Sequence, residues 1–296
     1  MGAKGQCKKG SSVEISTLRL RKRFWIGIIL LALIIAIGVK AHSDTMATPV
    51  VQRTSVSLAS YPADAEPVTI ALISDVHVAG PDMPPSRFAE IVEQINALSP
   101  DYVMIAGDLV SEKRSATHIY TAEEVTAPLE GLSGDVFKIA VPGNHDHWFG
   151  VDGIRAGLVK AGFTVLENEA AQFGPLAVGG IDDDYTNRAD LPNTLAAMGP
   201  LSGGGIILSH SPDPFPTLPE NFGLMLAGHT HCGQIRYPWG GAPATMSDYG
   251  ERYACGRVDE NGNSVIVGAG LGTSLLPVRL FSKPEIWLIT IRSPDP

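Results

Sequence analysis

The sequence predicts an α/β fold, because from residue 66 onward short β-branched or aliphatic runs alternate with segments that have a helical apolar pattern. The length of 296 residues suffices for one large α/β domain or two small ones. Hydrophobic residues make up 44% of the chain, so a sizeable core is expected. Outside this pattern, an aliphatic segment near the amino terminus predicts a separate hydrophobic helix.

That amino-terminal segment follows a basic cluster. Its sixteen uncharged residues, Phe24 to Val39, are slightly few for a spanning helix, but the flanking Arg23 and Lys40 can extend its reach. We therefore expect an uncleaved signal-anchor, with a signal peptide cleaved after Ala41 as the alternative. The positive-inside rule then predicts a single-pass inner-membrane protein with its globular domain outside the cytoplasm, or a secreted or periplasmic protein if the segment is cleaved. The expected divisions are a basic cytoplasmic segment (1–23), the anchor (24–41), a linker rich in Ser, Thr, Ala and Pro (42–65) and the globular domain (66–292).

Five apolar runs are expected to form strands of the domain. A helix is expected at about 86–98, after the first of them, with Ser86 as its cap. Its apolar face comprises Phe88, Ile91, Val92 and Ile95. The five runs are 68–73, 102–106, 136–141, 205–209 and 224–227.

Each of the five runs stops at Asp, Asn or His. The carboxyl ends of strands form the ligand crevice of open α/β sheets, so these side chains are expected to meet. Residues two apart in an extended segment point the same way, which pairs Asp75 with His77 and His229 with His231. One such His is usually a hydrogen-bonded loop residue, whereas five coincident cases indicate a site. The candidates are Asp75, His77, Asp108, Asn144, His210, His229 and His231.

These candidates are carboxylates, imidazoles and one amide, with no thiolate among them. This composition excludes an iron–sulfur cluster and a Cys-rich structural zinc site, and it suits Zn²⁺, Mn²⁺ or Fe in an open catalytic site. Seven ligands exceed the need of one tetrahedral ion. Two divalent ions that share a bridging carboxylate would use all seven.

In order and spacing, these residues resemble the signature of the calcineurin-like metallophosphoesterase superfamily over residues 66–292. The segments "GHTHCGQIRYP" and "GLGTSLLPVRLFSKPEI" resemble its membrane-associated, YkuE-like bacterial branch. The resemblance implies a four-layer α/β/β/α sandwich of two mixed sheets, with the metals at one edge. It assigns Asp75, His77, Asp108 and His231 to the first metal. It assigns Asp108, Asn144, His210 and His229 to the second metal, with Asp108 bridging.

The resemblance also gives His145 a catalytic role, in stabilising the transition-state oxygens or protonating the leaving oxygen. Asp146 is then expected to orient His145 through a carboxylate–imidazole hydrogen bond. His147 and Trp148 are expected to make a rim hydrogen bond and a packing contact. In the implied reaction, two metals lower the pKa of a shared water, and hydroxide attacks phosphorus in line.

The expected activity is hydrolysis of a phosphodiester or pyrophosphate bond, with a lipid-linked substrate suggested by the anchor and the YkuE-like resemblance. The alternative within the enzyme class is a soluble nucleotide or phosphomonoester phosphatase. From other classes, a non-catalytic interaction module or a membrane-anchored metal-storage protein would share the fold.

Charge narrows the choice of partners. Residues 1–40 hold eight Lys/Arg and one acidic residue, Glu14, so the net charge of −9 leaves −16 on residues 41–296. No nucleic-acid partner is expected of so acidic a domain. A phosphorylated substrate, small or lipid-linked, must therefore meet local positive charge.

Three further features carry weaker expectations. Cys232 and Cys255 could pair in an exported domain, but two ordinary thiols are the favoured expectation. Asp182, Asp183 and Asp184 are expected to form a solvated turn rather than a further metal cluster. Arg236 and Arg279 could contact a substrate phosphate, but each is expected at the surface or in an ion pair.

Overall fold

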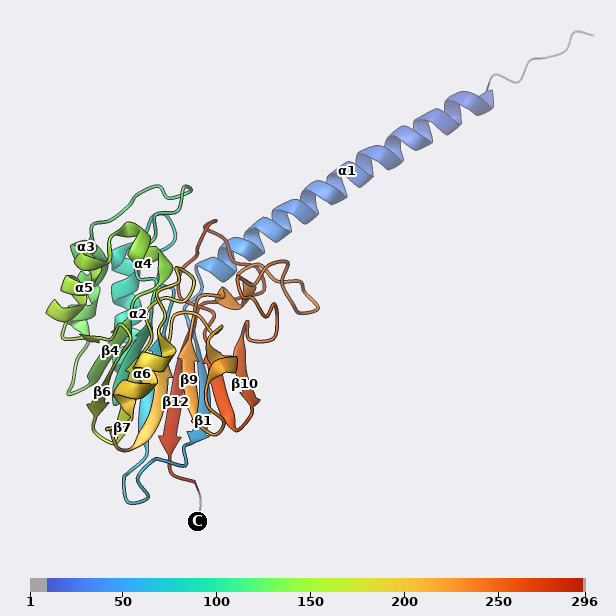
Figure 1. Ribbon diagram of the computed structural model, residues 1–296. Helices are drawn as coiled ribbons and strands as arrows, with labels where there is room; N and C mark the ends of the chain where they lie inside the picture. Colours follow the sequence, from blue (N-terminus) through green and yellow to red (C-terminus); the bar gives the residue numbers. More distant parts are fainter. Residues whose placement is uncertain (1–9, 295–296) are drawn as a thin grey trace, which may run out of the picture. The chain divides into compact units, whose positions relative to one another are not determined.

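The computed structural model describes residues 10–294, with side chains described from residue 19 (Figure 1). The chain forms two compact units, one ending at Ser43 and the other beginning at Asp44. The first unit carries helix α1 (Gly10–Thr45), whose last two residues belong to the second unit. From Arg19 to Thr45 this helix is long and apolar enough to cross a membrane, and its most apolar stretch is not buried in the protein.

The second unit contains two six-stranded mixed sheets. The first sheet has the order β1-β12-β2-β3-β4-β5, in which β12 is antiparallel to β2 and the other neighbours are parallel. Its strands are β1 (Val50–Ser57), β2 (Val68–Ile73), β3 (Tyr102–Ala106), β4 (Phe137–Val141), β5 (Thr164–Val165) and β12 (Glu285–Arg292). The second sheet has the order β10-β11-β9-β8-β7-β6. Its strands are β6 (Glu169–Phe173), β7 (Leu176–Gly180), β8 (Gly204–Leu208), β9 (Leu224–Ala227), β10 (Gly256–Glu260) and β11 (Asn263–Val267).

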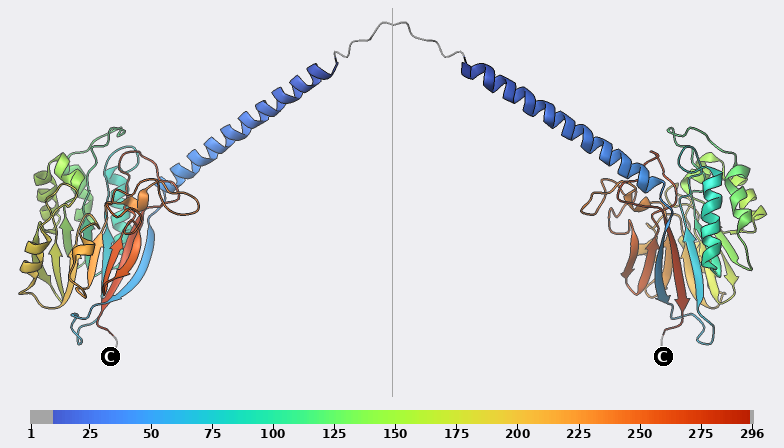
Figure 2. Two further views of the ribbon diagram at one scale, coloured as in Figure 1. Left: turned by 45° about the vertical axis from the view of Figure 1, so that its right-hand side comes forward. Right: turned by 180° about the vertical axis from the view of Figure 1, so that it is seen from behind.

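Helices cover the outer faces of the two sheets, as Figures 1 and 2 show. The helices are α2 (Pro85–Leu98), α3 (Ala122–Thr126), α4 (Asn144–Phe149), α5 (Val151–Lys160) and α6 (Leu191–Met198). One apolar cluster joins α2 and α5 to the first sheet, a second lies between the sheets, and a third joins α6 to the second sheet. The expected four-layer α/β/β/α sandwich is therefore confirmed.

Strand β2 contributes apolar side chains to two different clusters, one on each face of its sheet. Ile70 and Leu72 belong to the cluster between the sheets, whereas Ala71 and Ile73 belong to the cluster beneath α2. Successive side chains of a strand point to opposite faces, so a continuous apolar run is what a strand buried on both faces requires. The strands expected at 68–73, 102–106 and 224–227 have the predicted bounds, and those expected at 136–141 and 205–209 are present within one residue at each end.

Two expectations about local structure are wrong. Helix α2 begins at Pro85 with Pro84 as its N-cap residue and no capping side chain, so Ser86 is not a cap. Proline suits the first helical position because it has no N–H to leave unpaired. The expected linker 42–65 contains β1, which pairs in parallel with β12 from Val50 to Ser57. Its polar composition suits an edge strand with exposed side chains.

Candidate metal centre

The seven expected ligands lie together at the carboxyl ends of five strands. Each sits in the loop or first helical turn directly after its strand, as the sequence predicted. Asp75 and His77 follow β2, Asp108 follows β3, Asn144 follows β4, His210 follows β8, and His229 and His231 follow β9. All seven side chains are buried, and strands from both sheets contribute to the group.

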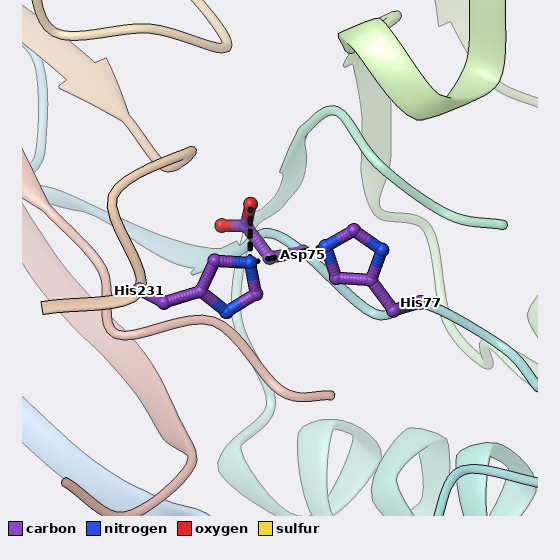
Figure 3. Close-up of side chains that lie close together, drawn as sticks. All are labelled: Asp75, His77 and His231. Atoms are coloured by element: carbon purple, nitrogen blue, oxygen red, sulfur yellow. Dashed lines mark hydrogen bonds and ion pairs between the residues drawn. The ribbon is translucent and has the colours of Figure 1, made fainter. Parts of the chain in front are cut away.

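One set of ligand atoms is formed by Asp75, His77 and His231 (Figure 3). The Nε2 atoms of His77 and His231 lie 3.0 Å apart, and their rings are stacked with centroids 4.9 Å apart. Asp75 Oδ1 lies 3.5 Å from His231 Nε2. Two imidazole nitrogens and a carboxylate oxygen therefore face a common point.

A second set is formed by Asp108, Asn144, His210 and His229. His210 Nε2 lies 3.0 Å from Asn144 Oδ1 and 3.0 Å from His229 Nδ1. Asp108 Oδ2 lies 3.3 Å from His210 Nε2 and 3.6 Å from His77 Nε2 of the first set. The Asp108 carboxylate thus lies between the two sets.

The backbone, rather than strand alternation, aims these ligands. Asp75, His77 and Asp108 have φ of 49°, 48° and 56°, and His229 and His231 have φ of 68° and 50°. The expected extended pairing is therefore wrong in its geometry, although each pair does reach the site. A left-handed conformation costs a non-glycine residue about 1–3 kcal/mol, and such strain is typical of functional sites.

Two glycines permit the close approach of these loops. A Cβ on Gly143 would lie 2.3 Å from Asp108 Oδ1, and one on Gly228 would lie 2.5 Å from Asp75 Oδ2. Both contacts are shorter than van der Waals separation, so any larger residue would push a carboxylate away. The glycines preceding Asn144 and His229 are thus part of the packing of the site.

Backbone carbonyls fix two of the imidazole rings. The Nδ1 of His210 lies 2.8 Å from the carbonyl oxygen of Ala106, and that of His77 lies 3.3 Å from the carbonyl oxygen of Val110. Such bonds hold the proton on Nδ1 and leave the Nε2 lone pair toward the site, which is the usual arrangement for a metal-binding histidine.

The charges of the site suit divalent cations. Burial raises the pKa of Asp75 to about 6, and the negative charge of Asp108 adds to this effect. Burial lowers the pKa of His229 to about 3 and holds those of His77 and His231 well below their usual range, so these rings are neutral and able to bind metal. For His210, burial lowers the pKa but the Asp108 charge raises it well above its usual range. A cation would displace that proton. The residues present therefore fit two divalent cations.

Arg279 lies beside this site and is buried, so it is not at the surface, which was one of its two expected environments. Its guanidinium is fully buried and donates to the carbonyl oxygens of Ala269 and Gly272, at 2.7 and 2.9 Å. Nη2 also lies 3.3 Å from His231 Nδ1. Burial lowers the pKa of Arg279 to about 10, so the side chain stays cationic at neutral pH.

His145 lies beside both sets of ligands but is held by a residue that sequence reasoning missed. Its Nδ1 lies 2.9 Å from Glu112 Oε2, and its ring meets that of His77 edge-on at 4.7 Å. Burial lowers the pKa of His145, but the Glu112 hydrogen bond and the Asp108 charge raise it above its usual range. No motif marks Glu112, which lies 33 residues before His145.

Asp146 does not orient His145, contrary to the expectation. Its carboxylate accepts hydrogen bonds from the backbone N–H groups of Asp108, Leu109 and Gly143 at 2.8–3.0 Å. Asp146 therefore joins the loop after β3 to the loop after β4. It is a positioning residue for Asp108. The carboxylate that holds His145 belongs to Glu112 instead.

We expect Glu112→Ala to lower kcat by about ten- to a hundredfold with little change in KM, since outer partners of site residues contribute effects of this size. Glu112→Gln keeps a hydrogen-bond acceptor without the charge and should retain more activity. Steady-state kinetics on one diester substrate would measure both. Equal, small losses in the two variants would show that Glu112 does not position His145.

An exposed aromatic pair lies next to the ligands. The Trp148 ring meets that of His145 at 4.9 Å, and the Tyr185 ring meets that of His229 at 4.8 Å. The two rings lie 6.1 Å apart and both are exposed. Trp148 therefore packs as expected, and it also presents apolar surface beside the site.

The loop after β7 differs in part from the expected solvated turn. His147 Nε2 lies 2.6 Å from Asp182 Oδ1, which is the rim hydrogen bond expected of His147. Asp183 is fully buried and its Oδ2 accepts from the Thr186 N–H at 2.7 Å, so it is not solvated. The close turn from Asp183 to Thr186 requires this side-chain acceptor.

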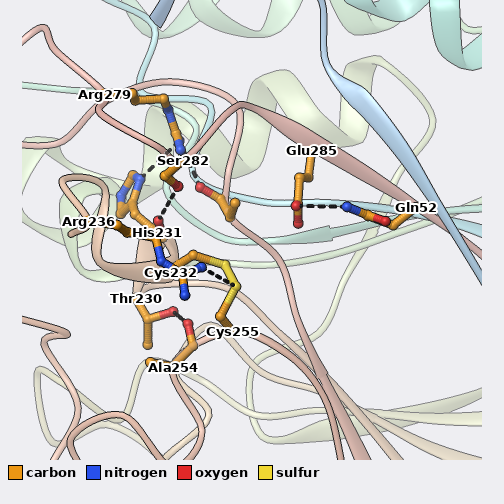
Figure 4. The surroundings of a disulfide bond; sticks show 11 residues. Gln52, Thr230, His231, Cys232, Arg236, Ala254, Cys255, Arg279, Ser282 and Glu285 are labelled. Atoms are coloured by element: carbon orange, nitrogen blue, oxygen red, sulfur yellow. Dashed lines mark hydrogen bonds between the residues drawn. A yellow bond between two sulfur atoms is a disulfide. The ribbon is translucent and has the colours of Figure 1, made fainter. Parts of the chain in front are cut away.

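Cys232 and Cys255 form a disulfide, so the expectation of two free thiols is wrong (Figure 4). The two loops are also joined by the Thr230 hydroxyl, which donates to the Ala254 carbonyl oxygen at 2.7 Å. Spacing in sequence cannot reveal that the chain folds position 255 back beside position 232. Because Cys232 follows His231 directly, the disulfide fixes the backbone that carries a candidate ligand.

We expect a Cys232→Ser/Cys255→Ser variant to lose about 2–4 kcal/mol of unfolding free energy, because the disulfide limits the freedom of the unfolded chain. Urea unfolding would measure this loss. Dithiothreitol should lower the wild-type midpoint to that of the variant and leave the variant unchanged. A wild-type midpoint that is insensitive to reductant would contradict the pairing.

Comparisons with known proteins agree with this geometry. The family model described as "Calcineurin-like phosphoesterase" matches residues 68–233. The chain is 30% identical to the "Uncharacterized metallophosphoesterase YkuE" of Bacillus subtilis, over 69% of this chain and 72% of that protein. It is 28% identical to the "Phosphodiesterase YaeI" of Escherichia coli, over 79% of this chain and 86% of that one. It is also 28% identical to the "Transmembrane protein with metallophosphoesterase domain" of Danio rerio, over 82% of this chain but only 57% of that protein.

The family model covers Asp75, Asp108 and Asn144, together with His145 and both histidines of the loop after β9. These are the residues that the fold brings to the ends of its strands. The chain therefore belongs to the calcineurin-like phosphoesterase family, whose members are metal-dependent hydrolases.

Proposed function

We propose that this chain is a two-metal phosphoesterase that hydrolyses a phosphodiester or pyrophosphate bond. The observation that carries the proposal is the position of Asp108, with Oδ2 3.6 Å from His77 of one ligand set and 3.3 Å from His210 of the other. Asp75, His77, Asp108 and His231 would hold one cation. Asp108, Asn144, His210 and His229 would hold the other.

When bound, the two cations supply Lewis acidity, which favours deprotonation of a water and neutralises charge on the phosphoryl oxygens. The chain's own residues orient the reaction. Glu112 holds His145 at Nδ1, which leaves the other ring nitrogen for the substrate. There His145 can donate a proton to the leaving oxygen. Asn144 completes a ligand set without adding negative charge.

Charge and surface favour a diester over a phosphomonoester. A diester carries one negative charge where a monoester dianion carries two, and the domain has an acidic balance. The exposed rings of Trp148 and Tyr185 offer an apolar surface for an organic substituent on the phosphate. The related protein YaeI of Escherichia coli is also named a phosphodiesterase.

Two observations support a lipid-linked substrate outside the cytoplasm. Helix α1 is long and apolar enough to hold the chain in the inner membrane, with its basic flank inside. The Cys232–Cys255 disulfide is of a kind that persists in oxidising compartments. We therefore assign the catalytic domain to the outer side of that membrane, near lipid head groups.

The test compares bis-p-nitrophenyl phosphate with p-nitrophenyl phosphate as substrates for the full chain in detergent, with Mn²⁺, Zn²⁺ or Fe²⁺ added after chelation. We expect metal-dependent release of p-nitrophenol from the diester at the higher kcat/KM. A higher kcat/KM for the monoester would favour a phosphomonoester or nucleotide phosphatase instead. Bound metal without turnover of either compound would indicate a non-catalytic or storage role.

A further inference from the structure

A group of exposed apolar side chains lies on two loops of the domain and at its first residues. Trp239 is 80% exposed and Leu275 is 72% exposed, which is unusual for side chains of this size. The Trp239 ring also stacks on Tyr237, with centroids 5.4 Å apart. We call this group the apolar rim. Its members are Met46, Tyr237, Trp239, Leu275, Leu276 and Phe281.

The two loops of the apolar rim are held side by side. Leu280 accepts from the Arg236 N–H at 2.9 Å and donates its own N–H to the Gln234 carbonyl oxygen at 3.0 Å. The Gln234 side chain donates to the carbonyl oxygens of Leu276 and Val278, both at 3.0 Å. Figures 1 and 2 show these loops, in orange-brown and red, at the end of the sheets opposite the C-terminus. The rim is therefore a fixed surface.

The domain begins at the same surface. The N–H of Phe281 donates to Asp44 Oδ2 at 2.8 Å, and the N–H of Arg279 donates to Thr45 Oγ1 at 2.7 Å. Arg87 Nη2 also donates to the Thr45 carbonyl oxygen at 2.8 Å. Asp44 is joined directly to the unit that carries the apolar helix. The chain therefore passes from its proposed membrane anchor to the rim within a few residues, each spanning about 3.8 Å at most.

The composition of the rim favours a lipid bilayer as its binding partner. Segments 234–240 and 274–281 contain only two charged residues, Arg236 and the buried Arg279. Tryptophan and tyrosine favour the head-group region of a bilayer, and leucine favours the acyl layer beneath it. Exposed apolar groups gathered in this way mark an interaction surface.

We propose that the apolar rim inserts into the interfacial layer of the membrane that holds α1, and so sets the metal centre beside lipid head groups. The rim leads directly to the centre, since Gln234 lies three residues after His231 and Ser282 Oγ donates to the His231 carbonyl oxygen at 3.3 Å. This inference rests on the proposed anchor and gives a structural reason for a lipid-linked substrate.

The test is tryptophan quenching by brominated phosphatidylcholine in vesicles that hold the full chain. Trp25 is first changed to Phe, because it lies in α1 and would itself be quenched. In that background we expect brominated lipid to lower the emission, and most of this effect to be lost when Trp239→Phe is added, which leaves Trp148 and Trp287 outside the apolar rim. The double variant Leu275→Ser/Leu276→Ser should weaken the quenching of Trp239, because it removes two apolar side chains that would help the rim enter the membrane.

A matched control places a tryptophan at the other end of the sheets. Glu220 is exposed and precedes the amino end of β9, so Glu220→Trp in the Trp25→Phe/Trp239→Phe background should show no quenching by brominated lipid. Equal quenching at positions 220 and 239, or none at 239, would overturn the proposal. Trp239 would instead lie between copies of the chain if it escaped lipid quenching and Trp239→Phe converted a dimer to a monomer.

Hydrolysis of bis-p-nitrophenyl phosphate separates this inference from the proposed function. The rim variants should hydrolyse this soluble diester like the wild type, because they change Trp239, Leu275 and Leu276, none of which is a candidate ligand. If the wild type showed quenching but no hydrolysis, membrane insertion of the rim would be supported and the proposed phosphodiesterase activity would be refuted. If it showed hydrolysis but no quenching, the phosphodiesterase activity would be supported and membrane insertion of the rim would be refuted.

Discussion

Asp108→Asn is expected to lower kcat/KM for a phosphodiester by about 10³-fold or more, because a metal pair contributes several kcal/mol to transition-state stabilisation. The change is nearly isosteric. An amide oxygen at this position can still accept from the backbone N–H of His145, whose nitrogen lies 2.8 Å from Asp108 Oδ1. What is lost is the negative charge between His77 and His210. Metal analysis of the purified full chain should therefore show less bound metal than in the wild type.

A control for Asp108→Asn lies at the other end of the same strand. Asp101 precedes β3 and accepts from the Thr69 N–H at 2.7 Å, so Asp101→Asn removes one carboxylate charge far from the ligands. Its activity and metal content should stay near those of the wild type. An Asp108→Asn variant with full metal content and full activity would refute the bridging role.

His145→Ala is expected to lower kcat by about 10²–10⁴-fold while the metal content is unchanged, since loss of a general acid has effects of this size. The loss should be greater for an alkyl leaving group than for p-nitrophenolate, which leaves readily without a proton. Kinetics on two diesters that differ only in the leaving group would measure this difference.

His145 also lies with His77 and Asp108 in a group whose ligand atoms are mutually close. If His145 were itself a ligand, His145→Ala would lower the metal content, and the assignment as general acid would be wrong. His118→Ala is a suitable control, because this ring contacts that of Tyr120 in the loop before α3. The control should change neither metal content nor the dependence on the leaving group.

The partners of His145 show where prediction from sequence stops. The side chains at the ends of apolar strands indicated the seven candidate ligands, because the carboxyl ends of such strands meet, and the family resemblance added His145. Asp146 was the obvious partner for His145, since it is the next residue. In the structure the first turn of α4 points that carboxylate at backbone N–H groups, and Glu112 reaches His145 from another loop.

The same limit applies to the disulfide and to the start of the domain. Cys232 and Cys255 are 23 residues apart, and their pairing depends on how the intervening loop returns. Strand β1 has too polar a composition to stand out from a linker, yet pairing with β12 supplies its hydrogen bonds. In both cases a contact distant in sequence decides the local structure.

The sequence by itself predicted the fold class, the apolar amino-terminal helix, the candidate ligands and the family, because buried strands and the polar residues at their ends leave a local pattern of residue types. Only the tertiary structure decided that Asp108 lies between two ligand sets, that Glu112 holds His145 and that the apolar rim adjoins the first residues of the domain. These relations depend on the distances between loops. Such distances arise from packing two sheets against each other, and no local pattern in the chain encodes them.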